Sequence, residues 1–136
     1  MTQRQVLVVQ KSWKIFRLIS PDIVGDVFYS KLFLEMPSLK KMFRNPMEEQ
    51  HKKLIDMLSM IVGRLHHIDD LANEIQELGK RHAGYGVKPS HYKLVGATLI
   101  WTLQQGIGQE WNDEIQDAWE TCYETISEAM IASSAD

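Results

Sequence analysis

One histidine stands where an imidazole nitrogen could bind a metal. His82 follows Leu78 by one helical turn, and Leu71 and Ile75 continue the same stripe upstream. The Leu78 carbonyl can accept a hydrogen bond from one ring nitrogen, which would fix the tautomer and leave the other nitrogen as a ligand. A histidine at a helix end can also be a plain surface residue that complements the helix dipole. If it is a ligand, a lone neutral imidazole fits haem iron best, so we predict a pocket for a flat, mostly apolar cofactor.

A second helical stretch, upstream of His82, offers two alternative faces to this pocket. If Gln50 faces the metal, its stripe is apolar and carries Met47, Leu54, Met57, Leu58 and Ile61. If His51 faces it, the stripe carries Glu48, Ile55, Leu58, Ser59 and Val62. The second choice buries a carboxylate without a partner, which is costly. We therefore predict that Gln50 faces the pocket and that His51 lies on the wetter flank beside Lys52 and Lys53. Coordination of the metal by His51 stays an alternative.

The elements that position these residues are all predicted to be helices. Strand alternation and two-residue hairpin turns are missing, and prolines and glycines stand where helices should begin and end. The predicted long helices cover about 2–19, 21–36, 46–65, 70–82, 89–105 and 112–132, with a short helix at 37–43 and a polar break at 66–70. Thr2, Ser20, Asn45 and Asn112 are the predicted N-caps.

Composition restricts the classes of protein to which the chain can belong. Its 136 residues, 44% of them apolar, suit one domain (1–136) with one sizeable core. A net charge of −3 argues against nucleic-acid binding, and no apolar run is long enough to cross a bilayer. The single Cys122 excludes an internal disulfide and any multi-cysteine metal site. With no leader-like start, we expect a reduced, cytoplasmic protein without nucleic-acid or membrane partners.

Several short motifs in a fixed order resemble one family. They are Val27–Phe33, Met36-Pro37, Lys41–Phe43, Leu78–Val87, Ser90–Gly96 and Asp117–Tyr123. Together they resemble the globins, above all the bacterial single-domain haemoglobins and the globin part of flavohaemoglobins. The resemblance covers nearly the whole chain. It implies an all-α globin fold in which haem b is held between a distal and a proximal helix.

The resemblance also implies roles for individual residues. His82 would be the proximal iron ligand and Phe43 the phenylalanine that packs on the haem. Tyr29 would point its hydroxyl into the distal pocket, where Gln50 is the second donor and Leu54 crowds the ligand. The other implied cofactor contacts are Lys53, Arg81, Tyr85, Val87, Tyr92 and Val95.

A globin with this pocket is expected to bind O₂, CO or NO at a five-coordinate iron, for O₂ storage or delivery or for NO scavenging. Because the sequence ends at Asp136, nitric oxide dioxygenase turnover would need a separate reductase. Tyr92 fits the place of a proximal tyrosine of flavohaemoglobins, but Ser134 stands where their glutamate is expected. In flavohaemoglobins this tyrosine and glutamate make the ligand histidine more basic, so this effect on His82 should be weaker. The alternatives are a partner-binding O₂ or redox sensor and a six-coordinate electron-transfer globin with His51 as distal ligand.

Overall fold

The computed structural model describes residues 1–134, and the regular secondary structure of these residues is all helical. The α-helices are α1 (Gln3–Phe16), α2 (Pro21–Glu35), α3 (Met47–Gly63), α4 (Ala72–Gly84), α5 (Pro89–Ile107) and α6 (Asp113–Ser134). Three short 3-10 helices connect them, namely η1 (Pro37–Met42), η2 (Leu65–Leu71) and η3 (Gly108–Glu110). The predicted all-α class and the six long helices are confirmed. The last two residues of the predicted domain, 135–136, lie outside the described residues.

Local chemistry explains where most helices begin. Thr2 and Gln5 exchange hydrogen bonds in a capping box at the start of α1. The Asn112 side chain accepts from the Ile115 amide at 2.9 Å and caps α6. The predicted side-chain caps of Ser20 and Asn45 are wrong, because Ser20 makes no capping bond and α3 begins directly after Pro46. Pro21 is the first residue of α2 and Pro46 is the N-cap of α3, and neither helix start has a side-chain cap.

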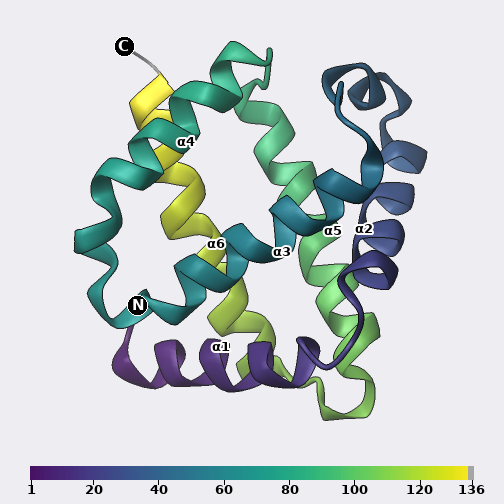
Figure 1. The fold of residues 1–136 in the computed structure, drawn as a ribbon. Helices are drawn as coiled ribbons and strands as arrows, with labels where there is room; N and C mark the ends of the chain where they lie inside the picture. Colours follow the sequence, from purple (N-terminus) through teal and green to yellow (C-terminus); the bar gives the residue numbers. More distant parts are fainter. Residues whose placement is uncertain (135–136) are drawn as a thin grey trace.

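The helices cross in a way that keeps α3 and α4 apart (Figure 1). Helix α4 packs along α6 at one side of the molecule, and α2 packs on α3 and α5 at the other. Helix α1 crosses the end of this arrangement and touches α3, α5 and α6. No Cα atom of α3 comes within 8 Å of one in α4. The backbones of these two helices are therefore not in direct contact.

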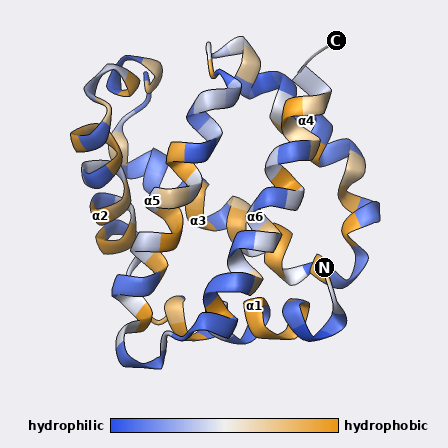
Figure 2. Ribbon diagram, turned by 180° about the vertical axis from the view of Figure 1, so that it is seen from behind, coloured by the Kyte–Doolittle hydropathy of each residue, from blue (hydrophilic) through white to orange (hydrophobic). Residues whose placement is uncertain are grey.

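Apolar residues from all the long helices except α4 build the main core. Apolar and polar residues are interspersed along the helices (Figure 2). The most buried side chains include Val9, Phe16, Leu32, Leu103 and Trp119. The Trp119 indole donates to Ser12 Oγ at 2.8 Å, which satisfies its buried N–H. A separate cluster of Leu71, Ile75, Tyr92 and Met130 anchors α4. Within residues 1–134, no helix has both the length and the apolar character needed to cross a membrane.

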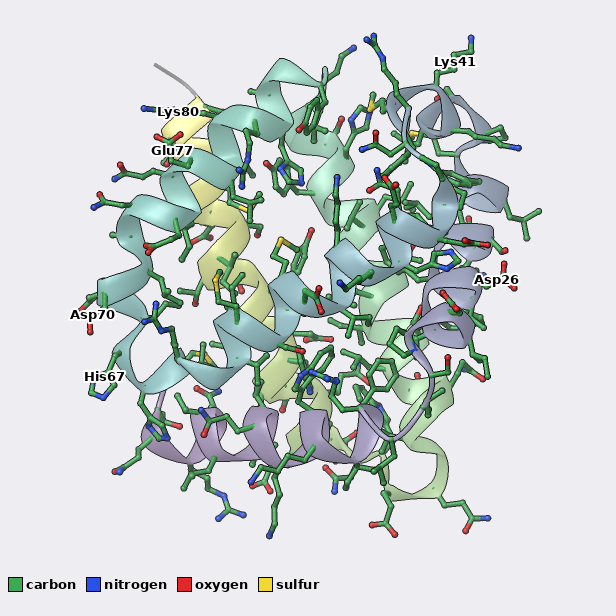
Figure 3. All side chains as sticks on the ribbon, in the orientation of Figure 1. Asp26, Lys41, His67, Asp70, Glu77 and Lys80 are labelled. Atoms are coloured by element: carbon green, nitrogen blue, oxygen red, sulfur yellow. The ribbon has the colours of Figure 1, made fainter. Side chains whose placement is uncertain are left out.

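The predicted polar break at 66–70 forms the 3-10 helix η2 instead of an irregular loop. Its ends, Leu65 and Leu71, are buried and tie it to the core, whereas His66 and His67 are exposed. His67 and Asp70 extend outward at the edge of the molecule (Figure 3). This histidine pair is therefore a surface feature.

Candidate functional site

The imidazole of His82 is held by its own helix. Its Nδ1 lies 2.7 Å from the Leu78 carbonyl oxygen, which can only accept, so Nδ1 carries the proton and Nε2 carries the lone pair. Burial lowers the pKa of His82, helped by the charge of Arg81 and opposed by the Leu78 hydrogen bond. The neutral form is thereby favoured, and it is the form of imidazole that can bind a metal.

Helix α4 is fixed by close contact with α6. A Cβ atom on Gly79 would lie only 2.5 Å from the Met130 carbonyl oxygen, so only glycine allows this approach. Leu71 and Ile75 are buried on the same side, as the sequence stripe predicted, and His82 at the end of the stripe is partly buried. The position of the imidazole is therefore set by backbone packing one turn before it.

Two tyrosines lie beside the His82 ring. The Tyr85 ring centroid is 6.2 Å away and that of Tyr92 is 6.5 Å away. Tyr85 is 62% exposed, whereas Tyr92 is buried and burial raises its pKa. The Tyr123 hydroxyl donates a hydrogen bond to the Tyr92 carbonyl at 2.6 Å, which connects α6 to α5. Ser134 donates within its own helix, to the Ile131 carbonyl.

Three aromatic rings form a second cluster. They are Tyr29 and Phe33 of α2 and Phe43, the residue directly after η1. Tyr29 lies edge-on to Phe43 with ring centroids 5.2 Å apart, and Phe33 contacts both rings. Sequence reasoning found Tyr29 and Phe43 but missed Phe33, although it lies one helical turn after Tyr29. Burial raises the pKa of Tyr29 to about 12, so the phenol keeps its proton and remains a donor.

Helix α3 presents two adjacent faces to the protein interior. His51 is 8% exposed and packs against α2, so the prediction that it lies on the wetter flank is wrong. Gln50 lies about 100° around the helix from His51 and is half-buried. It shares this second face with the half-buried Met47, Leu54 and Met57. The apolar pattern of this helix predicts one buried face, that of Gln50, and therefore assigns the adjacent face of His51 to solvent.

The other predicted cofactor contacts fall into two groups, exposed charged residues and half-buried apolar residues. Lys53 and Arg81 are exposed, on α3 and α4 respectively. Val87 and Val95 are half-buried, like Leu54 on the opposite side. These three apolar side chains are thus only partly covered by the rest of the protein. Together with the neutral His82, they suit a flat apolar group that carries a metal.

Two surface cavities lie elsewhere. One of about 480 Å³ lies between α6 and the η2–α4 region and includes Ile68, Ile75 and Ala129 in its lining. The other, of about 420 Å³, lies between α1 and α6 beside Arg4 and Glu114. Neither contains a residue of the candidate site.

Comparison with known proteins identifies the class. The Globin family model matches residues 26–130, and the chain belongs to the globin family. It is 28% identical over 112 residues to a flavohemoprotein of Bacillus subtilis, with 80% of this chain and 28% of the relative covered. It is 27% identical over 141 residues to a leghemoglobin of Psophocarpus tetragonolobus, with 95% and 94% covered. The chain thus spans under a third of this flavohemoprotein but nearly all of the leghemoglobin. Family membership implies a haem.

Solved structures share the fold. A bacterial globin from Campylobacter jejuni has a TM-score of 0.82 at 24% identity, with 98% of this chain and 96% of that chain covered. A hexacoordinated heme protein from an anhydrobiotic tardigrade has a TM-score of 0.87 at 20% identity, with 100% and 96% covered. These likenesses confirm that the chain has the globin fold.

Proposed function

We propose that this protein is a haem b globin that reversibly binds O₂, and also CO and NO, at a five-coordinate iron. The carrying observation is the half-buried His82 on α4, whose neutral form is favoured and whose Nδ1 is bound to the Leu78 carbonyl, so that Nε2 keeps its lone pair for a metal. Haem, when bound, supplies an iron with one ligand position left for a diatomic gas. The residues of this chain would hold the haem, orient it and tune the gas affinity.

On the proximal side, His82 would be the single protein ligand. The bond from Nδ1 to the Leu78 carbonyl fixes the ring and leaves the lone pair of Nε2, which would bind the iron. Tyr85, Tyr92, Val87 and Val95 would pack around the proximal face. The exposed Lys53 and Arg81 would pair with the haem propionates at the edge.

On the distal side, Tyr29 and Gln50 would donate hydrogen bonds to a ligand that gains negative charge on binding. Such bonds are worth roughly 1–3 kcal/mol each, because a charged acceptor strengthens them. The protonated phenol of Tyr29 suits this role. Leu54 and Phe43 would keep water away from the ligand. We therefore expect tight, slowly released O₂.

The same pocket supports two physiological roles, O₂ storage or delivery and NO scavenging with an external reductase. Six-coordination through His51 is less well supported, because that ring packs closely on the Gly25 backbone of α2. To become a ligand, the ring would have to leave the α2–α3 contact.

The test is an absorbance spectrum of the purified protein after incubation with hemin and reduction. We expect a Soret band and one broad visible band that changes when CO is added. Split visible bands without added ligand would contradict the five-coordinate state, and no Soret band would refute haem binding. NO consumption with a supplied reductant then separates scavenging from storage.

A further inference from the structure

His51 is a buried histidine with an unusual polar environment. Only 8% of the residue is exposed, and its Nδ1 has no hydrogen-bond partner among residues 1–134. A carboxylate oxygen of Asp22, in the first turn of α2, lies 3.5 Å from Nδ1, just beyond ordinary hydrogen-bond distance. The Asp22 side chain is 76% exposed and so is free to close this gap. A small rotation of Asp22 would satisfy the buried nitrogen.

The imidazole of His51 lies nearly parallel to the phenol ring of Tyr29. Their ring centroids are 5.8 Å apart and the ring planes differ by 19°, an offset-stacked arrangement. Gly25 makes the arrangement possible, because a Cβ there would lie 2.4 Å from His51 Cγ. One side chain of α3 thus covers one face of the Tyr29 ring, while Phe33 and Phe43 contact it elsewhere.

A purely space-filling residue would not need an imidazole at this place. An aliphatic side chain would fill the same volume without burying an unsatisfied nitrogen, which is unfavourable. The imidazole adds a flat face for Tyr29 and a nitrogen for Asp22. These two features connect an exposed carboxylate to the ring that carries the distal donor.

We infer that His51 is a positioning residue that fixes the orientation of the Tyr29 phenol, and that Asp22 in turn orients His51. This inference rests on the proposed function, in which Tyr29 donates to a gas ligand. It assigns His51 a role opposite to coordination, because the ring acts from within the α2–α3 contact and never binds the metal.

The first test measures O₂ release by stopped flow in the hemin-loaded protein. His51→Ala should release O₂ about three- to tenfold faster, since loss of the stacked ring frees Tyr29 to turn. His51→Phe keeps a flat ring and should stay within about twofold of the unmodified protein. In a Tyr29→Phe background, His51→Ala should change nothing further. An equal effect with and without the Tyr29 hydroxyl would overturn the inference.

A spectroscopic signature separates positioning from general loosening of the fold. In the CO complex, His51→Ala should shift the C–O stretching band toward the position seen in Tyr29→Phe, because both weaken the same hydrogen bond. Asp22→Asn should shift it less in the same direction, and should have no effect when combined with His51→Phe, which lacks Nδ1. A band that stays in place in His51→Ala would refute the role.

A third measurement needs no haem. In apoprotein with ¹³C-labelled tyrosine rings, the Tyr29 signal is assigned by its loss in Tyr29→Phe. We expect one Tyr29 signal in the unmodified apoprotein and several exchanging signals in His51→Ala, with the Tyr123 signal as an internal reference. A single sharp Tyr29 signal in His51→Ala would overturn the inference. If the multiple signals appear but no variant takes up hemin, positioning is supported and the proposed function fails instead.

Discussion

The two sides of the candidate site are built in different ways. The proximal side is local: His82 and the carbonyl that orients it belong to one turn of α4. The distal side is assembled from α2, the residue after η1, and α3: the Tyr29 ring contacts Phe43 and His51, fourteen and twenty-two positions away. A local site is fixed once its helix forms, whereas an assembled site depends on how helices cross. The proximal ligand should therefore tolerate distant changes that alter the distal donor.

Two glycines show how closely helices approach on both sides. Gly79 meets the backbone of Met130, and Gly25 meets Cβ and Cγ of His51, the part of that side chain nearest the α3 backbone. Neither set of atoms can move far without displacing a helix. Crowding at either glycine should therefore damage the fold.

Removal of the proximal imidazole should have the largest effect. We expect His82→Ala to lose haem or hold it only loosely, because the change removes the imidazole that would bind the iron. Transfer of haem to an acceptor apoglobin measures this loss. The exposed His67→Ala is the matched control and should retain haem. Full retention with an unaltered spectrum in His82→Ala would refute the ligand assignment.

Gly79→Ala should have the next largest effect. The added methyl group meets the α6 backbone, and overpacking of this kind costs about 1–3 kcal/mol of unfolding free energy. Urea unfolding of the apoprotein measures the loss. Gly84→Ala is the control on the same helix: nothing lies within 4 Å of the added Cβ, so its stability should stay equal or rise. Equal stability of the two variants would show that the α4–α6 contact is not tight.

Tyr29→Phe tests the assembled side. Loss of one hydrogen bond to a charged acceptor should speed O₂ release by about ten- to a hundredfold, with little change in haem retention. Because burial raises the pKa of Tyr29 to about 12, the slow release should persist at pH 10, where an exposed tyrosine is about half ionised. Tyr85→Phe, at an exposed position, is the control. An unchanged release rate in Tyr29→Phe would remove this hydroxyl from the pocket.

Tyr123→Phe should have the smallest effect. It removes the 2.6 Å bond to the Tyr92 carbonyl, worth about 0.5–1.5 kcal/mol of unfolding free energy. The O₂ release rate should not change, because this bond connects α6 to α5 and does not involve the proposed distal donors. A large change in release would mean that the two sides are coupled more strongly than their construction indicates.

Local patterns made much of the protein predictable. Helical spacing gave the six α-helices, and prolines marked the starts of α2 and α5, because both signals act within a few residues. The relation between His82 and Leu78 was predictable for the same reason, since a residue and the carbonyl one turn earlier are always neighbours in a helix. The motif order that resembles the globins supplied the family.

Only the tertiary structure decided what surrounds His51. Charge and periodicity on α3 assigned one face to the pocket and the next to solvent, yet packing against α2 buried His51 and left the Gln50 face half-buried. No local pattern could reveal this, because the burial of His51 requires Gly25, twenty-six positions away, to lack a side chain. Neighbouring residues determine where the helices form, but the faces that the helices bury depend on the elements against which they pack.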